Sequence, residues 1–467
     1  MVAKNRVLRL AYPGRAALLA ALLPLMVPGA HAQQPLAPAA HHNWAQWRGP
    51  LATGVAPDGD PPVEWSETHN IRWKIPLPGK GHSSPIIWED RIFLTAANPF
   101  GDEVRVEHDH VDGEHDNLPV TRAHRFVVLA IDRKDGAILW QRTVREATPR
   151  EGGHTTGSLA SASPVTDGKH VIAFFGSRGL FGFTLDGELL WEKDFGAMHT
   201  KHAHGEGSSP ALHDNIVIVN WDHDGESFVT ALETSTGKEI WKVARDEGTS
   251  WSTPLVVRHD GRHQVVISAT KRIRSYDLET GDVIWECAGL SDNVVASPVA
   301  ADGMLYAGSS YEFQAMLGIK LTGAKGNITD TDNVIWKIDR HTPYVPSPLL
   351  VDGRLYFIRH LQGLLSCMEA GTGRPVFGPV RLPGIHMVFA SPVAAKGRIY
   401  ISDRNGTTLV LNQADEPEIL ARNTLDDSFS ASPAIVGREI FLRGVHFLYC
   451  IAEAGDEPKP TTPSPPR

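Results

Sequence analysis

The chain has 467 residues, of which 42% are hydrophobic and 21% charged, and its formal net charge at pH 7 is −9. This acidic balance argues against nucleic acid and against an anionic membrane surface as the main partner, because both attract basic proteins. No apolar run approaches the roughly 18–20 residues of a membrane-spanning helix. A chain of this length ordinarily holds two or three domains, unless it is built from repeats.

The first 32 residues have the features of a secretion signal. Four basic residues precede a short apolar stretch, and Ala30-His31-Ala32 matches a cleavage site of small residues. Cleavage near Ala32 leaves 41 basic against 54 acidic residues, a net charge of −13. Residues 33–43 form a low-complexity linker. The protein is therefore expected to be exported, either to the periplasm or out of the cell.

Eight segments repeat one pattern: a small hydroxyl-bearing residue, then proline, then an apolar strand. Six of the seven intervals lie between 41 and 50 residues, and the seventh, of 79, contains an insertion at residues 98–124. Several segments lead into a turn such as Asp302-Gly303 and a second strand, which is a hairpin signal. The eight hydroxyl-bearing residues are Ser84, Ser163, Ser209, Thr253, Ser297, Ser347, Ser391 and Ser432.

A second series of apolar strands, most with a tryptophan, alternates with the first. Each repeat then holds four short strands, and this period is typical of a propeller blade. The last repeat, 432–453, has only three strands, while strand 71–77 has no blade before it. We expect strand 71–77 to complete the last blade and close the ring. The series, expected to pack between adjacent blades, is Trp73, Trp140, Trp191, Trp241, Trp285 and Trp336, with Phe377 and Leu420 as weaker members.

The sequence thus predicts an all-β fold, an eight-bladed β-propeller of four-stranded blades over residues 44–457. The tail, 458–467, contains five prolines and is expected to be disordered. The three cysteines, Cys287, Cys367 and Cys450, fall in blades four, six and eight. A disulfide needs Cα atoms within about 7 Å, so these residues are expected to be buried free thiols.

Three segments resemble a known docking motif. Ala130-Ile131-Asp132, with Gly136 and Trp140, resembles the A-x-D-x-x-T-G-x-x-x-W motif of propellers of the pyrroloquinoline-quinone (PQQ) type. Segments 231–241 and 276–285 are similar. The opening residues 43–50 look like the start of exported PQQ-like propeller proteins. The resemblance covers roughly residues 43–455.

This resemblance implies one of two functions. Quinoprotein alcohol dehydrogenases bind PQQ and Ca²⁺, whereas BamB-type propellers bind no quinone and act as scaffolds for other proteins. The chain departs from both branches. It lacks the vicinal cysteine pair found beside the quinone in many dehydrogenases, it offers no matching Ca²⁺ set, and it lacks the lipid-anchor cysteine of BamB.

Histidines concentrate in the loops that enter inner strands or join second and third strands, which usually form the ligand face of a propeller. In the first cluster, His202, His204 and Glu206 alternate, so an extended chain would point all three the same way. Imidazole and carboxylate ligands suit a transition metal. The alternative is ordinary hydrogen bonding within a loop.

Two further clusters contain residue types that can carry chemistry. Segment 221–224 contains Asp222 and His223, and Asp222 is the candidate for a catalytic base, unless it only forms an Asx turn. Segment 107–116 of the insertion is rich in metal-ligand types but is irregularly spaced, as in a solvated loop.

Other residues on these loops could face a ligand. Converging arginines could bind a carboxylate-bearing ligand such as PQQ, which has three carboxylates. These candidates are His154, Arg178, Trp251, Arg272 and Arg404, together with Glu247 and Arg443.

The expected function is that of an exported, monomeric, non-catalytic propeller that binds a protein, peptide or glycan. One alternative is a PQQ-dependent dehydrogenase that oxidises an alcohol or sugar, with Ca²⁺ assisting the quinone and Asp222 as base. A second alternative is a metal-dependent hydrolase or lyase on the histidine-rich face.

Overall fold

The computed structural model describes residues 42–104, 111 and 113–455, all within the unit Gln33–Arg467. The expected signal peptide, all but the last two residues of the linker, and the proline-rich tail lie outside the described residues. The described part contains 33 strands and two 3-10 turns, η1 (Gly176–Arg178) and η2 (Lys201–Ala203), with no α-helix. Within it, no helix is long and apolar enough to cross a membrane.

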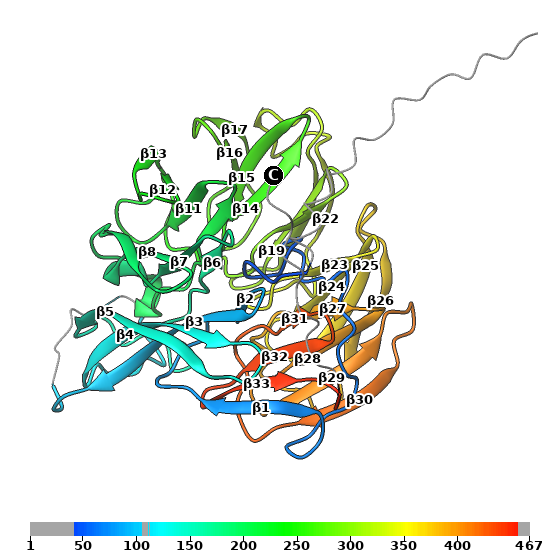
Figure 1. Ribbon diagram of the computed structural model, residues 1–467. Coiled ribbons are helices and arrows are strands. Elements are labelled where there is room, and N and C mark those ends of the chain that lie inside the picture. Colours follow the sequence, from blue (N-terminus) through cyan, green and yellow to red (C-terminus); the bar gives the residue numbers. More distant parts are fainter. Residues whose placement is uncertain (1–41, 105–110, 112, 456–467) are drawn as a thin grey trace, which may run out of the picture. The chain divides into compact units, whose positions relative to one another are not determined.

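The strands form eight sheets arranged in a ring (Figure 1), which confirms the predicted eight-bladed β-propeller. Blade 1 contains β2 (Ile86–Trp88), β3 (Arg91–Phe100), β4 (Ala123–Asp132) and β5 (Ile138–Ala147). Blade 2 contains β6 (Val165–Thr166), β7 (His170–Phe174), β8 (Leu180–Thr184) and β9 (Leu189–Lys193). Blade 3 contains β10 (Ala211–His213), β11 (Ile216–Trp221), β12 (Phe228–Glu233) and β13 (Glu239–Ala244). Blade 4 contains β14 (Leu255–His259), β15 (Arg262–Ile267), β16 (Ile273–Asp277) and β17 (Val283–Cys287).

The remaining blades repeat this order. Blade 5 contains β18 (Val299–Ala301), β19 (Met304–Ser309), β20 (Ala315–Lys320) and β22 (Val334–Ile338). Blade 6 contains β23 (Leu349–Val351), β24 (Arg354–Arg359), β25 (Leu364–Glu369) and β26 (Pro375–Arg381). Blade 7 contains β27 (Val393–Ala395), β28 (Arg398–Ser402), β29 (Thr407–Asn412) and β30 (Ile419–Thr424). Blade 8 contains β31 (Ala434–Val436), β32 (Glu439–Arg443), β33 (Phe447–Ile451) and β1 (Ile71–Pro76).

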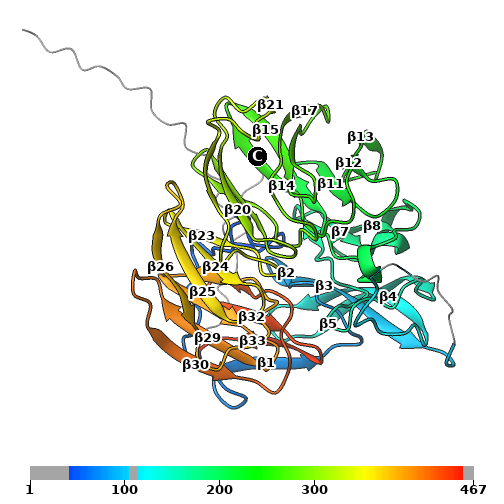
Figure 2. The same cartoon turned by 180° about the vertical axis from the view of Figure 1, so that it is seen from behind.

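Blade 8 closes the ring with strands from both ends of the domain. β1 pairs antiparallel with β33, and the order of the sheet is β1-β33-β32-β31. In Figures 1 and 2, β1 in blue lies directly beside β33 in red. The prediction that strand 71–77 completes the last blade is confirmed.

The repeated hydroxyl-bearing residues form a hydrogen-bonded ring around the axis, which we call the hydroxyl ring. In seven links, the backbone N–H of one blade's serine or threonine donates to the side-chain hydroxyl of the next blade's, at 2.8 to 3.1 Å. The links run from Ser84 in blade 1 to Ser432 in blade 8. The eighth link is open, because the buried hydroxyl of Ser84 has no partner among the described residues.

The tryptophans of the outer strands pack between adjacent blades, as predicted. Trp140 of blade 1 donates from Nε1 to the carbonyl of Leu185 in blade 2, at 2.8 Å. Its ring covers Gly187, which has φ +81° and where a Cβ would meet the indole at 2.5 Å. Only glycine fits this contact. The same pairing recurs at Trp73 with Gly136, Trp191 with Gly237, Trp241 with Gly281 and Trp336 with Gly373.

Trp285 in blade 4 makes a different hydrogen bond. Its Nε1 donates to Gln264 Oε1 within its own blade, at 3.2 Å. The reason is a short extra strand, β21 (Gly326–Asn327), which pairs parallel with β17 beside Trp285. Trp285 nevertheless packs against buried residues of blade 5, such as Leu305.

The segment before β1 crosses one end of the central channel. Trp44 pairs with Ile87 of blade 1, and Val55 pairs with Ala394 of blade 7. Between them, Arg48 is 3% exposed and donates to the carbonyls of Pro348 and Pro392 in blades 6 and 7, each at 2.8 Å, and to Thr53. Burial lowers the pKa of Arg48 to about 9. We call residues 44–56 the plug.

The connection between β3 and β4 is long, and both strands have ten residues. β3 ends at Phe100 and β4 begins at Ala123, so the connection between them spans residues 101–122. The three cysteines are free and buried. Burial raises the pKa of Cys287 and Cys367 to about 11 and that of Cys450 to about 12, which is consistent with unreactive thiols.

Candidate functional site

The main cavity lies at the centre of the ring, has a volume of about 420 Å³ and is lined by residues from the loops of all eight blades. One side chain per blade follows a simple rule: it stands two positions before the repeated serine or threonine. Because alternate residues of an extended chain point the same way, this position faces the axis in every blade. The eight lining residues are His82, Ser161, Gly207, Trp251, Val295, Val345, Phe389 and Ser430.

The wall of the cavity has an apolar half and a polar half. Blades 4 to 7 supply Trp251, Val295, Val345 and Phe389, whereas blades 8, 1, 2 and 3 supply serine, histidine and glycine. Further apolar and aromatic residues add to the apolar half, namely Tyr311, Tyr344, Leu361 and Met387. The plug contributes Trp47, which lines this cavity and a second one on the other side of the plug. Concave, largely apolar cavities with a few polar groups are typical ligand sites.

Four histidines gather at one side of this cavity. The rings of His115 and His204 are stacked, with centroids 4.8 Å apart, and their Nδ1 and Nε2 atoms lie 3.0 Å apart. His154 and His202 lie 4.8 and 5.3 Å from His204 between ring centroids. Burial and the three neighbouring histidines lower the pKa of His204 to about 4. This ring is therefore neutral at pH 7.

Glu206 does not join the histidines. Its carboxylate accepts hydrogen bonds from the backbone N–H and hydroxyl of Ser177 and from Arg178 Nη1 at 3.2 Å. The expected alternation fails because His202 and Gly205 have φ of +57° and +89°, so the segment is not extended. Among the described residues, no group of three or more His, Cys, Asp or Glu is arranged to hold a metal ion.

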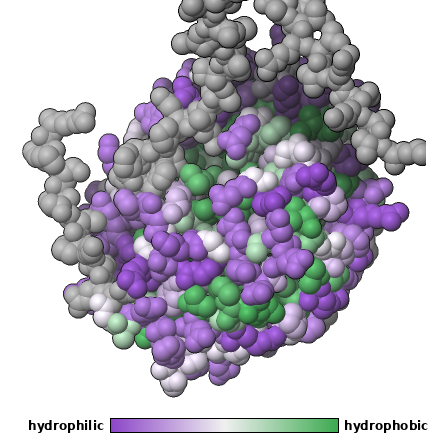
Figure 3. Space-filling model, turned by 90° about the vertical axis from the view of Figure 1, so that its right-hand side faces the viewer, coloured by the Kyte–Doolittle hydropathy of each residue, from purple (hydrophilic) through white to green (hydrophobic). Residues whose placement is uncertain are grey.

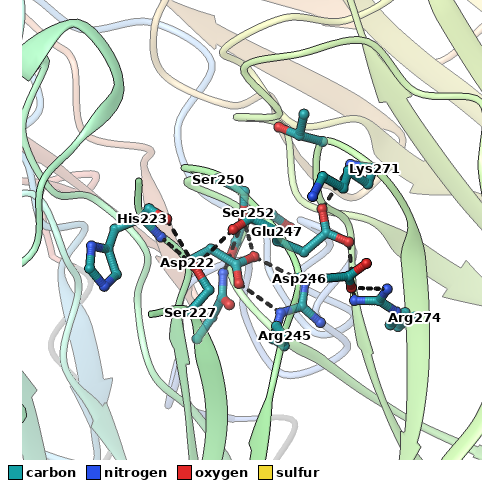
Figure 4. Close-up of polar contacts among 12 residues, drawn as sticks. Asp222, His223, Ser227, Arg245, Asp246, Glu247, Ser250, Ser252, Lys271 and Arg274 are labelled. Atoms are coloured by element: carbon teal, nitrogen blue, oxygen red, sulfur yellow. Dashed lines mark hydrogen bonds and ion pairs between the residues drawn. The ribbon is translucent and has the colours of Figure 1, made fainter. Parts of the chain in front are cut away.

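Asp222 is buried in an ion pair rather than open to the cavity (Figure 4). Its two carboxylate oxygens accept from Arg245 Nε at 2.7 Å and Nη2 at 3.0 Å, and Ser250 donates at 2.7 Å. Burial lowers the pKa of Arg245, but Asp222 and Tyr276 outweigh this effect, and the net shift is upward. These hydrogen bonds occupy both carboxylate oxygens, and Asp222 does not line the central cavity. The structure therefore gives Asp222 no role as a catalytic base.

The neighbouring candidates also lie outside the main cavity. His223 accepts at Nδ1 from the backbone N–H of His199, at 3.2 Å. Arg272 pairs with Asp246 and Glu286, at 3.1 and 3.5 Å. Figure 4 shows Asp222, Glu247 and Arg274 within one set of polar contacts rather than around an open space. There Glu247 accepts from the backbone N–H of Lys271, and burial raises its pKa.

The remaining candidates lie in or beside the cavity. His154, His204, Glu206 and Trp251 line it, and Arg178 lines a small pocket next to it. Arg404 lies over Phe389, with its guanidinium 5.1 Å from the ring centroid. Sequence reasoning missed most of the apolar half and Trp47. The position two before each repeated serine or threonine was the signal that could have identified three of them, Val295, Val345 and Phe389.

Quinone binding can be tested against this lining. PQQ carries three carboxylates, and Ca²⁺ takes six to eight oxygen ligands, carboxylates among them. Among the described residues, the lining contains one carboxylate, Glu206, which is already bound to Ser177 and Arg178 and is therefore not free to bind Ca²⁺. The residues present do not fit a calcium-assisted quinone in this cavity.

Much of the outer surface is ordinary for a propeller. Figure 3 views the molecule from one side, where hydrophobic residues form limited patches among hydrophilic ones. Many of the exposed large apolar residues belong to fourth strands of blades, for example Leu139, Leu190 and Ile240. The central cavity is therefore the better candidate for a specific site.

Structural comparison agrees with this fold. BamB from Moraxella catarrhalis superposes with a TM-score of 0.53 at 15% identity, covering 82% of this chain and 99% of that one. A europium-containing methanol dehydrogenase superposes with a TM-score of 0.58 at 12% identity, covering 87% and 90%. At these identities the likeness shows the fold alone.

Sequence comparison identifies the family. "Outer membrane protein assembly factor BamB" of Yersinia pestis is 22% identical over 342 residues, which cover 68% of this chain and 77% of the relative. Tetrathionate hydrolase of Acidithiobacillus ferrooxidans is 23% identical over 287 residues, and the chain spans 54% of its length. A family model described as "Outer membrane protein assembly factor BamB" matches residues 55–220 and 225–444. With most of its length matched and eight PQQ-like blades, the chain belongs to this family of propellers.

Proposed function

We propose that this protein is an exported, non-catalytic propeller that binds an extended peptide segment of a protein partner in its central cavity. The observation that supports this proposal is that the cavity wall has one apolar half and one polar half. Side chains alternate along an extended peptide, so one side of it can contact Trp251, Val345 and Phe389 while the other faces the histidines and serines. A glycan fits less well, because Val295 and Val345 offer no hydrogen bonds to sugar hydroxyls.

Family membership and sequence support the same reading. The relative from Yersinia pestis is named as an assembly factor for the outer membrane, which is consistent with a protein partner and with the periplasm. The predicted signal peptide with cleavage near Ala32 agrees with export. A monomer is sufficient, since the ring closes within one chain and no blade needs a strand from a second copy.

The alternatives lose support from the residues in the cavity. The dehydrogenase reading loses its proposed base, because Asp222 is tied to Arg245, and its lining does not fit PQQ with Ca²⁺. The hydrolase or lyase reading loses Glu206 as a ligand, because this carboxylate is bound to Ser177 and Arg178.

A peptide selection tests the proposal. Peptides selected from a random library on the mature protein would be measured by fluorescence anisotropy against wild type and Phe389→Ala. Loss of the buried ring contact should weaken binding by roughly 10- to 100-fold. Ile240→Ala is the control, since this residue is exposed on the outer strand β13.

Two outcomes would contradict the proposal. One is a failure to select any peptide whose affinity depends on Phe389. The other is saturable micromolar binding of PQQ that quenches tryptophan fluorescence, together with oxidation of an alcohol by a dye-linked assay.

A further inference from the structure

A group of basic side chains without acidic partners lies beside the main cavity. Lys80 and His82 stand just before β2, Arg404 lies between β28 and β29, and Arg443 ends β32. None of the four makes an ion pair with any described residue. In a chain with a net charge of −9, a local excess of positive charge is a notable departure. We call these four residues the basic cluster.

Arg443 is the most buried member, with 1% of its surface exposed. Its Nη1 donates to the carbonyl of Ser83 at 3.1 Å and to the Ser83 hydroxyl, while Nε and Nη2 have no partner among the described residues. Its Nη2 lies against Gly81, where a Cβ would collide with it. The guanidinium therefore lies against the chain between Lys80 and His82. Buried charges normally have a counterion, and the described residues supply none to Arg443.

The other members place this charge next to the cavity. His82 lines the main cavity, and its Nε2 is buried without a partner in the described residues. Burial and the charges of Lys80, Arg443 and Arg404 lower the pKa of His82 to about 3, so it is neutral at pH 7. Burial and Arg404 also lower the pKa of Lys80.

Lys80 and Arg404 have the access that Arg443 lacks. Lys80 lines another cavity, of about 410 Å³, which is distinct from the one beyond the plug and shares His154 with the main cavity. The Arg404 guanidinium lies over Phe389, at the edge of the apolar half. A ligand that contacts Phe389 in the apolar half can therefore place one of its ends near the Arg404 guanidinium. Charge-assisted hydrogen bonds from lysine and arginine favour a carboxylate in such a place.

We propose that Lys80 and Arg404, with the buried charge of Arg443 behind them, bind a carboxylate at the end of the peptide in the central cavity. This inference rests on the proposed function and specifies its ligand: a segment with a C-terminal carboxylate whose preceding side chains contact the apolar half. Arg443 acts as a positioning residue, since it is too buried to contact the ligand.

Matched peptides test the carboxylate site in the full mature protein. A selected peptide would be prepared with a free C-terminus, with a C-terminal amide, and with a C-terminal amide after an added glutamate. Amidation should weaken binding to wild type by about 10- to 100-fold and should have little further effect in the double variant Lys80→Gln/Arg404→Gln. Arg340→Gln removes the same charge from an arginine with an 85% exposed side chain and should bind like wild type.

Each outcome has one meaning. Recovery of affinity by the added glutamate supports a carboxylate site that accepts a side chain as well as a chain end. Equal binding of the acid and the amide overturns the site, and if Phe389→Ala still weakens both, the proposed function survives. If no peptide binds, the proposed function fails, and the site is then measured with N-acetylphenylalanine against its amide. Equal affinity of those two compounds would overturn the site as well.

Discussion

Asp222 and Arg443 are both buried ionisable residues, yet their surroundings differ. Asp222 has a bidentate partner in Arg245 and a third hydrogen bond from Ser250. In the part of the chain that the structure describes, Arg443 donates only to the oxygens of Ser83, and two of its nitrogens find no acceptor. The first arrangement supports the fold, and the second leaves charge available to act on a ligand.

Asp222→Asn tests the structural role of this ion pair. The change leaves Arg245 as an uncompensated buried charge, which typically costs about 3–5 kcal/mol. We expect the urea midpoint of unfolding, followed by tryptophan fluorescence, to fall accordingly. Asp415→Asn, which breaks an exposed pair with Arg354, should change it by less than about 1 kcal/mol. A stable Asp222→Asn protein that had lost an enzymatic activity would instead revive the catalytic reading.

The histidine group gives a pH-dependent contribution to stability. The folded pKa of His204, about 4, lies below its ordinary value of 6.5, owing to burial and to His154, His202 and His115. Between pH 6.5 and about 4, His204 is therefore protonated in the unfolded chain but neutral in the folded chain. Stability should fall as pH drops from 6.5 towards 4. The urea midpoint should decline less steeply over this range in His204→Gln, and parallel declines would contradict the assignment.

Individual site residues were only partly predictable from sequence. Two of the loop residues predicted to face a ligand, His154 and Trp251, line the cavity. Glu206 also lines the cavity, but it does not point the same way as the histidines, because the left-handed residues at 202, 203 and 205 break the expected alternation. The partner of Asp222, Arg245, lies 23 residues away, directly after the end of β13, and sequence spacing does not reveal such pairs.

At the level of elements, five of the eight blades are attached to the next by an indole ring over a glycine. The pairing of Trp140 with Gly187 and Leu185 shows the rule. The strand series was predictable because both of its features repeat at the blade period. β21 was not, since it pairs only through a tertiary contact at Trp285.

Trp73→Ala should weaken the attachment of blade 8 to blade 1. The indole is 8% exposed and donates to the carbonyl of Arg133 at 3.0 Å. Its removal should lower the free energy of unfolding by about 3–5 kcal/mol, as measured by urea titration. Ile138→Ala on the outer strand β5, where the side chain is 48% exposed, should cost less than about 1 kcal/mol. Similar losses in both variants would count against a specific role for Trp73.

For the molecule as a whole, the ring and its plug form one unit. The plug contacts blades 1 and 7, and Arg48 ties it to blades 6 and 7. Trp47 of the plug thereby forms part of the wall of the central cavity. Closure of the ring could be predicted from the complementary end strands. The plug could not, because its contacts involve carbonyls that any sequence supplies.

Arg48→Ala tests the plug. The carbonyls of Pro348, Pro392 and Thr53 would lose their donor, and each unsatisfied buried group costs about 1–3 kcal/mol. We expect lower stability in urea and faster proteolytic cleavage within residues 44–56. Arg374→Ala, at an exposed turn, should cleave like wild type. Unchanged cleavage in Arg48→Ala would show that the plug is held by other contacts.

The open link of the hydroxyl ring sets the junction between blades 8 and 1 apart from the other seven. Seven junctions carry a hydrogen bond from a backbone N–H to a side-chain hydroxyl. Among the described residues, the junction between Ser432 and Ser84 carries no such bond. Blade 8 is also the blade whose strands come from both ends of the domain. At this seam Arg443 of blade 8 donates instead to the carbonyl and hydroxyl of Ser83 in blade 1, and Trp73 covers Gly136. Side-chain contacts therefore replace the backbone link that is found at the other seven junctions.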